Sequence, residues 1–510
     1  MTDWSAGYVT EINYSFGFYR ELSPSFLAFS ALVRGTDEPS FNRERLRVLE
    51  LGCGQGESAV IIAAARPEID YVAIDFNPAH IAGASSLARK ASIKNLTLRE
   101  ASFADIAADE SFGQFDIITL HGIYTWVSEE NREHILKIAH DKLCPGGLLY
   151  VSYNCHPGWT PVIPMRRLIT DVADAMPRAS VPDRIKAGLD ILRKLAGTNV
   201  QAVAGISGLK ERIERISAMP LNYVAHEYLN SHWTIFHSAD VAVEMGRAKL
   251  SYVASANVWD VVDALNFTPE QQQLIVDQHD PSLRETLRDI ITNQQFRRDI
   301  FIRGPIPLRG DEGRERWLDL RLALTTRAQD VPRKIKGPIG EVTLHAPTYD
   351  PVLEALSAGP CTMRDLISLP AIAALSSASL QQAITILIGM NVLAPALPVA
   401  NEATRVKRTE VLNGVFLERA RFSTDHNFLA SPVIGAGVSV DRINQLILLS
   451  QRKKADPVHF MWGILSAQGQ KLVKEGKALE TEAENLSELE MRVASFNEKV
   501  APVLKQLKVW

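Results

Sequence analysis

The stretch Val48-Leu-Glu-Leu-Gly-Cys-Gly-Gln-Gly56 indicates the fold of this chain most directly. Its apolar start predicts a buried strand, which runs into Gly52, Gly54 and Gly56 before helical spacing begins near Glu57. Glycines permit a tight turn with positive φ and let a ligand approach the backbone closely. The spacing is G-x-G-x-G, which differs from the dinucleotide pattern G-x-G-x-x-G and lacks the Lys-Ser/Thr of a P-loop. We therefore predict a strand–turn–helix unit with a ligand-binding turn.

Short apolar runs and amphipathic stretches alternate around this turn. We expect strands at 48–51, 71–74, 96–100, 115–120 and 147–153, and helices at 58–66, 78–91 and 129–143. Such alternation predicts an α/β fold with a doubly wound, mostly parallel, Rossmann-like sheet. A later helix and strand within 238–253 would complete the sheet, so we expect the helical stretch at about 161–225 to be an insertion.

The length of 510 residues is enough for about three domains. We expect a first domain at 1–260, which contains the glycine turn and the insertion. A helical segment at 261–310 should follow, in which Thr268-Pro-Glu-Gln271 forms a capping box. The pattern of residues 311–400 predicts a winged-helix-like middle domain or a simple helical packing module, and residues 401–510 are expected to form a mostly helical accessory domain.

Composition argues against several classes of protein. The 55 Lys and Arg residues nearly balance 59 Asp and Glu residues, a net charge of −4, so no electrostatic argument favours a nucleic-acid binder. Four cysteines without a C-x-x-C pair argue against a disulfide framework or a thiolate zinc site. The start lacks a signal-peptide pattern, and no apolar run approaches the ~18–20 residues that cross a bilayer. We expect a cytoplasmic protein without integral membrane association.

A second motif, Tyr71-Val-Ala-Ile-Asp75, ends the next strand with a carboxylate roughly twenty residues after the glycine turn. A carboxylate at this place can accept both hydroxyls of a ribose, although a lone Asp at a strand end can also cap a helix. Glu50 lies two positions before the first glycine. Together with the glycine turn, which is similar to motif I, these residues resemble the class I S-adenosylmethionine-dependent methyltransferases.

This resemblance implies that S-adenosyl-L-methionine is the cofactor. Ser102 occupies the place where the family commonly has an acidic residue facing the adenine amine, and Asp105 follows slightly later. Phe103 is expected either to stack on the adenine or to belong to the core. The residues implied to bind the cofactor are Tyr14, Glu50, Gly52, Cys53, Gly54, Gly56, Asp75, Phe76, Ser102, Phe103 and His121.

Further motifs resemble a narrower family. The N-terminal stretch from Tyr14 to Pro24 fits this group as a segment that lies over the cofactor. The other motifs are His121-Gly-Ile-Tyr-Thr-Trp126, Tyr153-Asn-Cys-His-Pro-Gly-Trp159, 225–230 and 293–299. Over about residues 8–305 the chain is similar to bacterial methyltransferases with a methyltransferase regulatory domain, a group that includes protein lysine methyltransferases acting on outer-membrane protein.

The methyl acceptor is expected where the fourth and fifth strands end. Aromatic rings pack against a cationic sulfonium and shape a pocket for an amine, although such rings also pack sheet edges. Imidazole can accept a proton near neutral pH, although structural histidines are commoner. The catalytic candidates are Tyr124, Trp126, His121, Tyr153, Asn154, His156 and Trp159.

A metal site is not expected. His226-Glu227 with His232 and His237 invites that interpretation, but the spacing does not match His-Glu-x-x-His, the pattern that places two zinc ligands on one helical face.

Three functions stay open on the sequence. The first is methyl transfer to a protein lysine amine, because bulky extra domains suit a protein substrate. The second is N- or O-methylation of a small molecule, such as a natural product or envelope precursor, with the extra domains serving dimerisation, so a homodimer stays open. The third is a cofactor-sensing regulator that binds DNA through about 350–400, but the stretch 379–392 lacks a basic stripe. We expect a protein or small-molecule methyl acceptor and no nucleic-acid partner.

Overall fold

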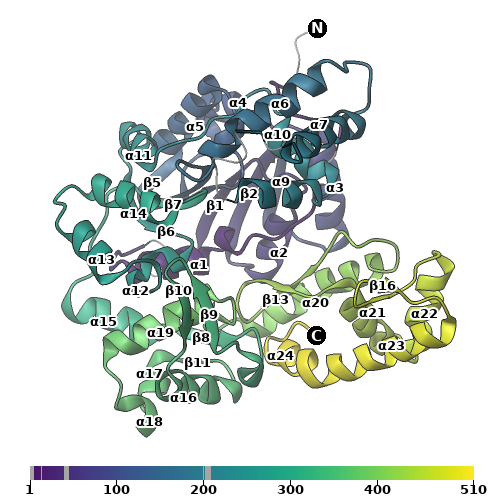
Figure 1. The fold of residues 1–510 in the computed structure, drawn as a ribbon. Coiled ribbons are helices and arrows are strands. Elements are labelled where there is room, and N and C mark those ends of the chain that lie inside the picture. Colours follow the sequence, from purple (N-terminus) through teal and green to yellow (C-terminus); the bar gives the residue numbers. More distant parts are fainter. Residues whose placement is uncertain (1–4, 13, 39–44, 199, 202–207) are drawn as a thin grey trace.

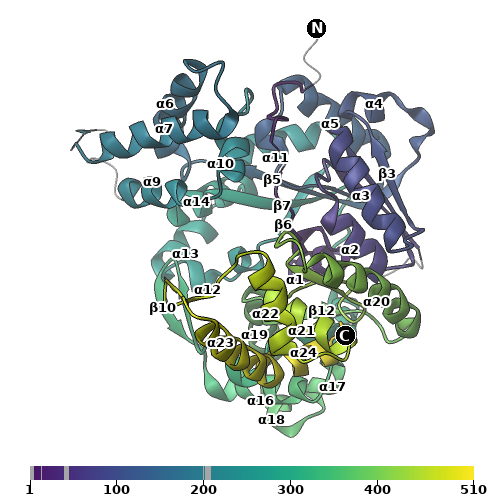
Figure 2. The ribbon, with the colours of Figure 1, turned by 90° about the vertical axis from the view of Figure 1, so that its right-hand side faces the viewer.

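A computed structural model describes residues 5–12, 14–38, 45–198, 200–201 and 208–510. Figure 1 shows an α/β part, coloured purple to teal, above a C-terminal part coloured green to yellow. The same two parts are seen from another side in Figure 2. One hydrophobic cluster extends from Val48 and Ile62 in the first part to Phe416 and Leu446 in the second, so the two parts pack directly against each other.

A seven-stranded sheet forms the centre of the first part, in the order β3-β2-β1-β4-β5-β7-β6. Strands β1 to β5 are parallel, and β7 pairs antiparallel with both β5 and β6. This arrangement confirms the predicted doubly wound, Rossmann-like fold. The strands are β1 (Leu46–Leu51), β2 (Ile69–Asp75), β3 (Leu96–Glu100), β4 (Phe115–Leu120), β5 (Leu143–Asn154), β6 (Ser251–Ser255) and β7 (Phe296–Ile302).

Helices cover both faces of this sheet, and each face has its own hydrophobic cluster. Every residue of the helix after the glycine turn is buried, because that helix packs on the sheet and also on helix α20 (Glu402–Arg419) of the C-terminal part. Its sequence is therefore apolar all round rather than amphipathic. The covering helices are α1 (Pro24–Val33), α2 (Glu57–Ala65), α3 (Pro78–Lys90), α4 (Phe103–Ala108), α5 (Glu129–Lys142) and α11 (Ser238–Arg247).

Four α-helices of the described residues lie between β5 and α11 in the chain and form a layer beside the sheet (Figure 2). Their apolar faces meet in a separate hydrophobic cluster that includes Trp159, Ile169, Leu189 and Ile213. The helices are α6 (Ile163–Asp174), α7 (Val181–Ala196), α9 (Leu209–Ser217) and α10 (Leu221–Tyr228).

The segment 261–310, expected to be helical, departs from that expectation at its end. It contains α12 (Asp263–Asn266), α13 (Pro269–Val276) and α14 (Pro281–Thr292), and the expected capping box of Thr268 and Gln271 is present. After α14, however, the chain enters the sheet as β7, between β5 and β6. The expectation of a wholly helical segment is therefore wrong, and the helix–strand at 238–253 completes the sheet only together with β7.

A buried arginine in β7 explains why the strand was missed. The guanidinium of Arg297 forms ion pairs with Glu285, Asp289 and Asp299 at 2.9, 2.6 and 2.9 Å. Burial of a charge is tolerated only when it is paired and hydrogen-bonded in this way. The polar sequence Arg297-Arg298-Asp299 consequently breaks the apolar run that marks the other strands.

The C-terminal part begins with α15 (Gly310–Asp319) and a small antiparallel sheet in the order β11-β8-β12. Four helices, α16 to α19, lie between β8 and β12 in the chain. Two-stranded hairpins and further helices follow, and none of the helices in the described ranges is both long and apolar enough to cross a membrane. The elements are β8 (Arg321–Leu324), β9 (Lys334–Gly337), β10 (Gly340–Thr343), α16 (Ala346–Ser357), β11 (Cys361–Thr362), α17 (Met363–Ile367), α18 (Pro370–Ala373), α19 (Ser377–Gly389), β12 (Leu393–Ala396), β13 (Phe428–Ser431), β14 (Ala436–Ser439), α21 (Arg442–Arg452), α22 (Pro457–Ala467), β15 (Val473–Lys474), β16 (Lys477–Ala478), α23 (Glu482–Ser495) and α24 (Ala501–Gln506).

Candidate active site

The glycine turn between β1 and α2 is tightly packed at its two ends and open at its centre. Gly52, Gly54 and Gly56 have φ angles of 73°, 53° and 69°, a region that favours glycine. A Cβ atom on Gly52 would lie 2.4 Å from the side chain of Ile123, and one on Gly56 would lie 2.7 Å from Ala84. A Cβ on Gly54 would meet no heavy atom within 4 Å. The turn is thus packed tightly at its ends and leaves open space at its centre.

Asp75 ends β2 beside this turn, and its carboxylate is held from three directions. Oδ2 accepts a hydrogen bond from the backbone N of Gly54 at 2.8 Å. Oδ1 accepts one from the backbone N of Asn77 at 2.9 Å and lies 3.2 Å from Nδ1 of His80. A carboxylate offers about four acceptor positions, so Oδ2 can still accept a ligand hydroxyl, and Oδ1 can accept one in place of His80. The sequence did not point to His80, which lies in the first turns of α3.

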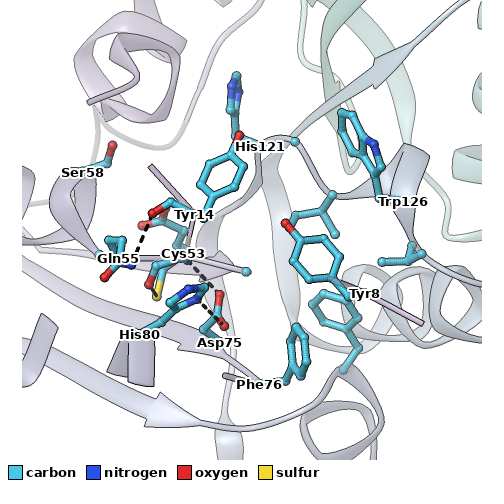
Figure 3. A pocket seen from close by; sticks show the side chains of 18 of the residues that line it. Tyr8, Tyr14, Cys53, Gln55, Ser58, Asp75, Phe76, His80, His121 and Trp126 are labelled. Atoms are coloured by element: carbon cyan, nitrogen blue, oxygen red, sulfur yellow. Dashed lines mark hydrogen bonds and ion pairs between the residues drawn. The ribbon is translucent and has the colours of Figure 1, made fainter. Parts of the chain in front are cut away.

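These groups surround a cavity of about 190 Å³ at the carboxyl ends of the strands (Figure 3). In Figure 3, Asp75, Phe76, Tyr8, Tyr14 and Trp126 lie around the same space. All eleven residues that the sequence implied for the cofactor line this cavity: Tyr14, Glu50, Gly52, Cys53, Gly54, Gly56, Asp75, Phe76, Ser102, Phe103 and His121. Ligands of open α/β sheets bind at this edge, beyond the carboxyl ends of the strands.

Ser102 is the N-cap residue of helix α4. Its hydroxyl accepts from the backbone N of Asp105 at 3.2 Å, and its backbone N donates to Asp105 Oδ2 at 2.8 Å, which makes a capping box. The cap fixes Phe103 as the first residue of the helix, where its ring lines the cavity. Phe103 also packs against the hydrophobic cluster on that face of the sheet, so its position is compatible with both expectations.

Glu50 is buried on the floor of the cavity with one protein partner. The hydroxyl of Tyr71 donates to its Oε2 at 2.8 Å. Burial, and to a lesser extent the charge of Asp75, raises the pKa of Glu50 to about 7, against the opposing effect of the Tyr71 bond. The side chain therefore changes its charge near neutral pH, at the edge of the proposed ligand site.

The N-terminal segment closes the cavity and contributes two tyrosines that the sequence did not single out. Tyr19 packs on the ring of His121 with a centroid distance of 4.0 Å, and Tyr8 packs edge-on against Phe76 at 5.9 Å. The segment is fastened to α2, because the backbone N of Tyr19 donates to Ser58 Oγ at 3.1 Å. Tyr8, Tyr14 and Tyr19 all line the cavity.

Two catalytic candidates, His121 and Trp126, also line the cavity. Burial and the charge of Arg298 lower the pKa of His121 to about 3, so the ring is neutral and a poor proton acceptor at neutral pH. Its Nδ1 lies 2.7 Å from the hydroxyl of Tyr150. Trp126 Nε1 is buried and has no hydrogen-bond partner among the described residues, which leaves a donor for a ligand.

Four other candidates lie outside the cavity wall and have protein partners. The hydroxyl of Tyr124 donates to Glu244, and that of Tyr153 donates to Asp299 at 2.5 Å. Both tyrosines are fully buried, so neither ring reaches a ligand in the cavity. His156 Nδ1 lies 2.7 Å from Thr160 Oγ1, and Trp159 packs against Trp233 and Tyr228. In this structure they pack the sheet and the insertion.

Asn154, the last candidate, ends β5 and contacts the insertion. Its backbone N donates to Thr125 Oγ1 at 2.8 Å, which fixes the strand end. Its side-chain Nδ2 donates to Glu227 Oε1 on α10 at 3.2 Å. The sequence placed Glu227 only in a rejected metal pattern, so its approach to Asn154 is a finding of the structure.

Two family models match the chain: "Methyltransferase domain" at residues 42–200 and "Predicted methyltransferase regulatory domain" at residues 220–303. The structure of PKMT2 from Rickettsia typhi in complex with AdoHcy has a TM-score of 0.70 at 19% identity, covering 98% of this chain and 100% of that chain. The uncharacterized protein sll1526 of Synechocystis sp. is 37% identical over 508 residues, 99% of each chain. The uncharacterized protein RP028 of Rickettsia prowazekii is 29% identical over 217 residues, 42% of this chain and 84% of its own.

The strand order, the glycine turn and the matched domains define the class of this protein. It is a class I S-adenosylmethionine-dependent methyltransferase that carries a methyltransferase regulatory domain. Within that class the chain belongs to the family of sll1526, to which it is similar along nearly its whole length. The fold that it shares with PKMT2 extends over the C-terminal part as well.

Proposed function

We propose that this methyltransferase transfers the methyl group of S-adenosylmethionine to the amine of a lysine in a protein substrate. The observation that carries the proposal is the agreement in fold with PKMT2, whose name denotes a protein lysine methyltransferase, over 98% of the chain. Agreement of this extent includes the insertion and the C-terminal part, which a minimal enzyme for a small molecule does not need.

The cofactor site in this proposal is the cavity above the glycine turn. Asp75 would accept the two ribose hydroxyls, since its carboxylate faces the cavity and is held in place by the turn itself. Phe76 and Phe103 would flank the adenine, and Glu50 would interact with the cationic methionine end. The fit of the cofactor to this cavity rests on these donors and acceptors and on the open space at Gly54.

The protein's contribution to catalysis is mainly position and exclusion of water. The bound cofactor supplies an electrophilic methyl group on a sulfonium. Tyr8, Tyr14 and Tyr19 cover the cavity, and Trp126 closes the side next to β4. An amine held ~3–3.5 Å from the methyl carbon in line with the carbon–sulfur bond gains most of its rate from that placement.

Cofactor affinity is expected to fall as the pH decreases through about 7. Glu50, with its pKa near 7, is neutral below that pH and loses its attraction for a cationic ligand, by up to about tenfold per pH unit. Calorimetry of S-adenosylmethionine binding between about pH 6 and about pH 8 measures the effect. Glu50→Gln should give nearly pH-independent binding, and Glu130→Gln, on the exposed surface of α5, should behave as the wild type. A flat wild-type profile would contradict the role given to Glu50.

Label transfer tests the substrate class. The enzyme is incubated with methyl-labelled S-adenosylmethionine and a bacterial lysate, and label in protein bands is compared with label in small molecules. We expect label in protein, with mass spectrometry placing it on lysine side chains, and no label with Asp75→Ala enzyme. Label confined to small molecules would contradict the proposed protein substrate and favour the small-molecule alternative.

A further inference from the structure

Helix α10 lies against the N-terminal segment that covers the cofactor cavity. His226 Nε2 donates to the carbonyl of Ile12 at 3.0 Å, and its ring contacts Tyr8 and Tyr14 at centroid distances of 5.4 and 5.1 Å. Just beyond α10, the backbone N of Ser231 donates to the carbonyl of Gly7 at 2.8 Å. The helix and the segment therefore form one wall above the cavity.

Glu227, the next residue on α10, presents a carboxylate without a counter-ion. It is only partly buried, and Asn154 Nδ2 donates to its Oε1 at 3.2 Å. No nitrogen of Lys, Arg or His in the described ranges lies within ion-pair distance of it. The charge of Arg212 acts on it, but that guanidinium donates to the carbonyl of Gly158 at 2.8 Å and stacks over Trp159. The carboxylate is free to receive a cation from outside.

The tyrosines near Glu227 include two that line the cavity and one at the protein surface. Tyr8 lines the cavity, and its ring packs on that of His226, the residue before Glu227 on α10. Burial and then the charges of Asp75 and Glu227 raise the pKa of Tyr8. On the outer side, burial and the charge of Glu227 raise the pKa of Tyr223, which is 37% exposed, to about 12. Burial, and to a smaller extent the charge of Glu227, also raises the pKa of Tyr14, a second residue that lines the cavity. Glu227 therefore lies at the end of β5, on the helix whose preceding residue, His226, packs against the tyrosines that line the cavity.

We propose that Glu227 binds the ammonium group of the methyl acceptor and takes up its proton, with Asn154 orienting the carboxylate and Tyr8, Tyr14 and Tyr223 forming the aromatic wall. This inference rests on the proposed function and names the residues that would select an alkyl amine. An extended lysine side chain suits this set of residues, because its methylenes can pack on the tyrosine rings and its cation can contact both the π-faces and the Glu227 carboxylate.

Methyl transfer to the amine needs no group besides the cofactor, the ammonium group and the Glu227 carboxylate. The ammonium group passes one proton to the Glu227 carboxylate and becomes a neutral amine. The nitrogen lone pair then forms a bond to the methyl carbon while the carbon–sulfur bond breaks and its electron pair stays on sulfur. The product is a methylated ammonium group and a neutral thioether. Glu227 returns its proton to water through its exposed side.

The titration of Glu227 has to be separated from that of its neighbours. Burial raises its pKa to about 7, against the bond from Asn154 and the charge of Arg212. The groups that face it are Tyr8 and Tyr14 of the N-terminal segment, Asn154 of β5, Arg212 of α9, and Tyr223, His226 and Tyr228 of α10. The ionised carboxylate is the active form, so kcat/KM for the acceptor should rise with pH through about 7.

Glu227→Gln in the full-length enzyme tests the inference on a lysine-containing protein substrate at saturating cofactor, which removes any contribution of Glu50. We expect S-adenosylmethionine affinity within about threefold of the wild type, and kcat/KM for the acceptor lower by about 10²–10⁴-fold. The rise with pH through 7 should disappear. Glu214→Gln, on the exposed face of α9, should keep the wild-type rate and profile.

The two proposals fail in different ways. A wild-type enzyme that methylates no lysine contradicts the proposed function. A wild-type enzyme that methylates lysine while Glu227→Gln keeps its rate and pH profile contradicts only the role of Glu227. The wild-type profile gives a second measurement that does not depend on the folding of a variant, because a kcat/KM that is flat between about pH 6 and about pH 8 would also overturn the inference.

Discussion

Asp75→Ala is expected to weaken S-adenosylmethionine binding by a factor of about 10²–10⁴. Two hydrogen bonds from ribose hydroxyls to a charged group contribute roughly 1.5–3 kcal/mol each, and each 1.4 kcal/mol corresponds to about tenfold in affinity. The substitution also frees the backbone N–H groups of Gly54 and Asn77 and the ring of His80, so the turn loses its support. Isothermal titration calorimetry measures the loss.

Two further variants serve as controls for Asp75→Ala. Asp75→Asn keeps the shape of the side chain but places an amide NH2 against one of the two backbone N–H donors, so it should bind the cofactor poorly while its thermal stability falls less than that of Asp75→Ala. Asp141→Ala removes an exposed carboxylate of α5, paired with Lys137 far from the cavity, and should bind normally. Wild-type affinity in Asp75→Ala would overturn the assignment of the site.

Gly54→Val should abolish cofactor binding while most of the fold's stability is kept. The new Cβ meets no heavy atom within 4 Å, so the side chain enters the open space at the cavity wall. The φ of 53° costs a side chain about 1–2 kcal/mol, which lowers the free energy of unfolding by that amount. Calorimetry with S-adenosylmethionine should show no binding heat, and chemical denaturation should show the small loss of stability.

Gly304→Val is the matched control for this variant. Gly304 also has a positive φ, 79°, and open space around its would-be Cβ, but it lies outside the cavity. The control should lose a similar amount of stability and keep normal cofactor affinity. Normal binding by Gly54→Val would show that the space above the turn is not where the cofactor lies.

Local sequence was enough to predict the parallel strands β1 to β5 and a set of residues that meet around one cavity. Glycine spacing and the carboxylate of Asp75 are local features that follow directly from a strand end, and every residue implied to bind the cofactor lines one cavity. The same reasoning missed β7, because the partners that neutralise Arg297 come partly from α14 and cannot be read from the strand's own pattern.

The acceptor side was harder to predict for a physical reason. Tyr153 and Tyr124 carry the same aromatic chemistry as Tyr8, but both rings are buried in the core, Tyr153 from β5 and Tyr124 from the short 3-10 helix after β4. Their hydroxyls donate to carboxylates there. Glu227 reaches Asn154 only because the insertion folds back over the strand ends, a contact between residues 73 positions apart. No local pattern encodes such an approach.

A crystal structure of the enzyme with S-adenosylhomocysteine would test the central claim most directly. We expect the Asp75 carboxylate to lie within hydrogen-bond distance of both ribose hydroxyls and the sulfur to face Tyr8, Asn154 and Glu227. A ligand bound away from the glycine turn, or bound there with its sulfur turned away from those three residues, would contradict that claim.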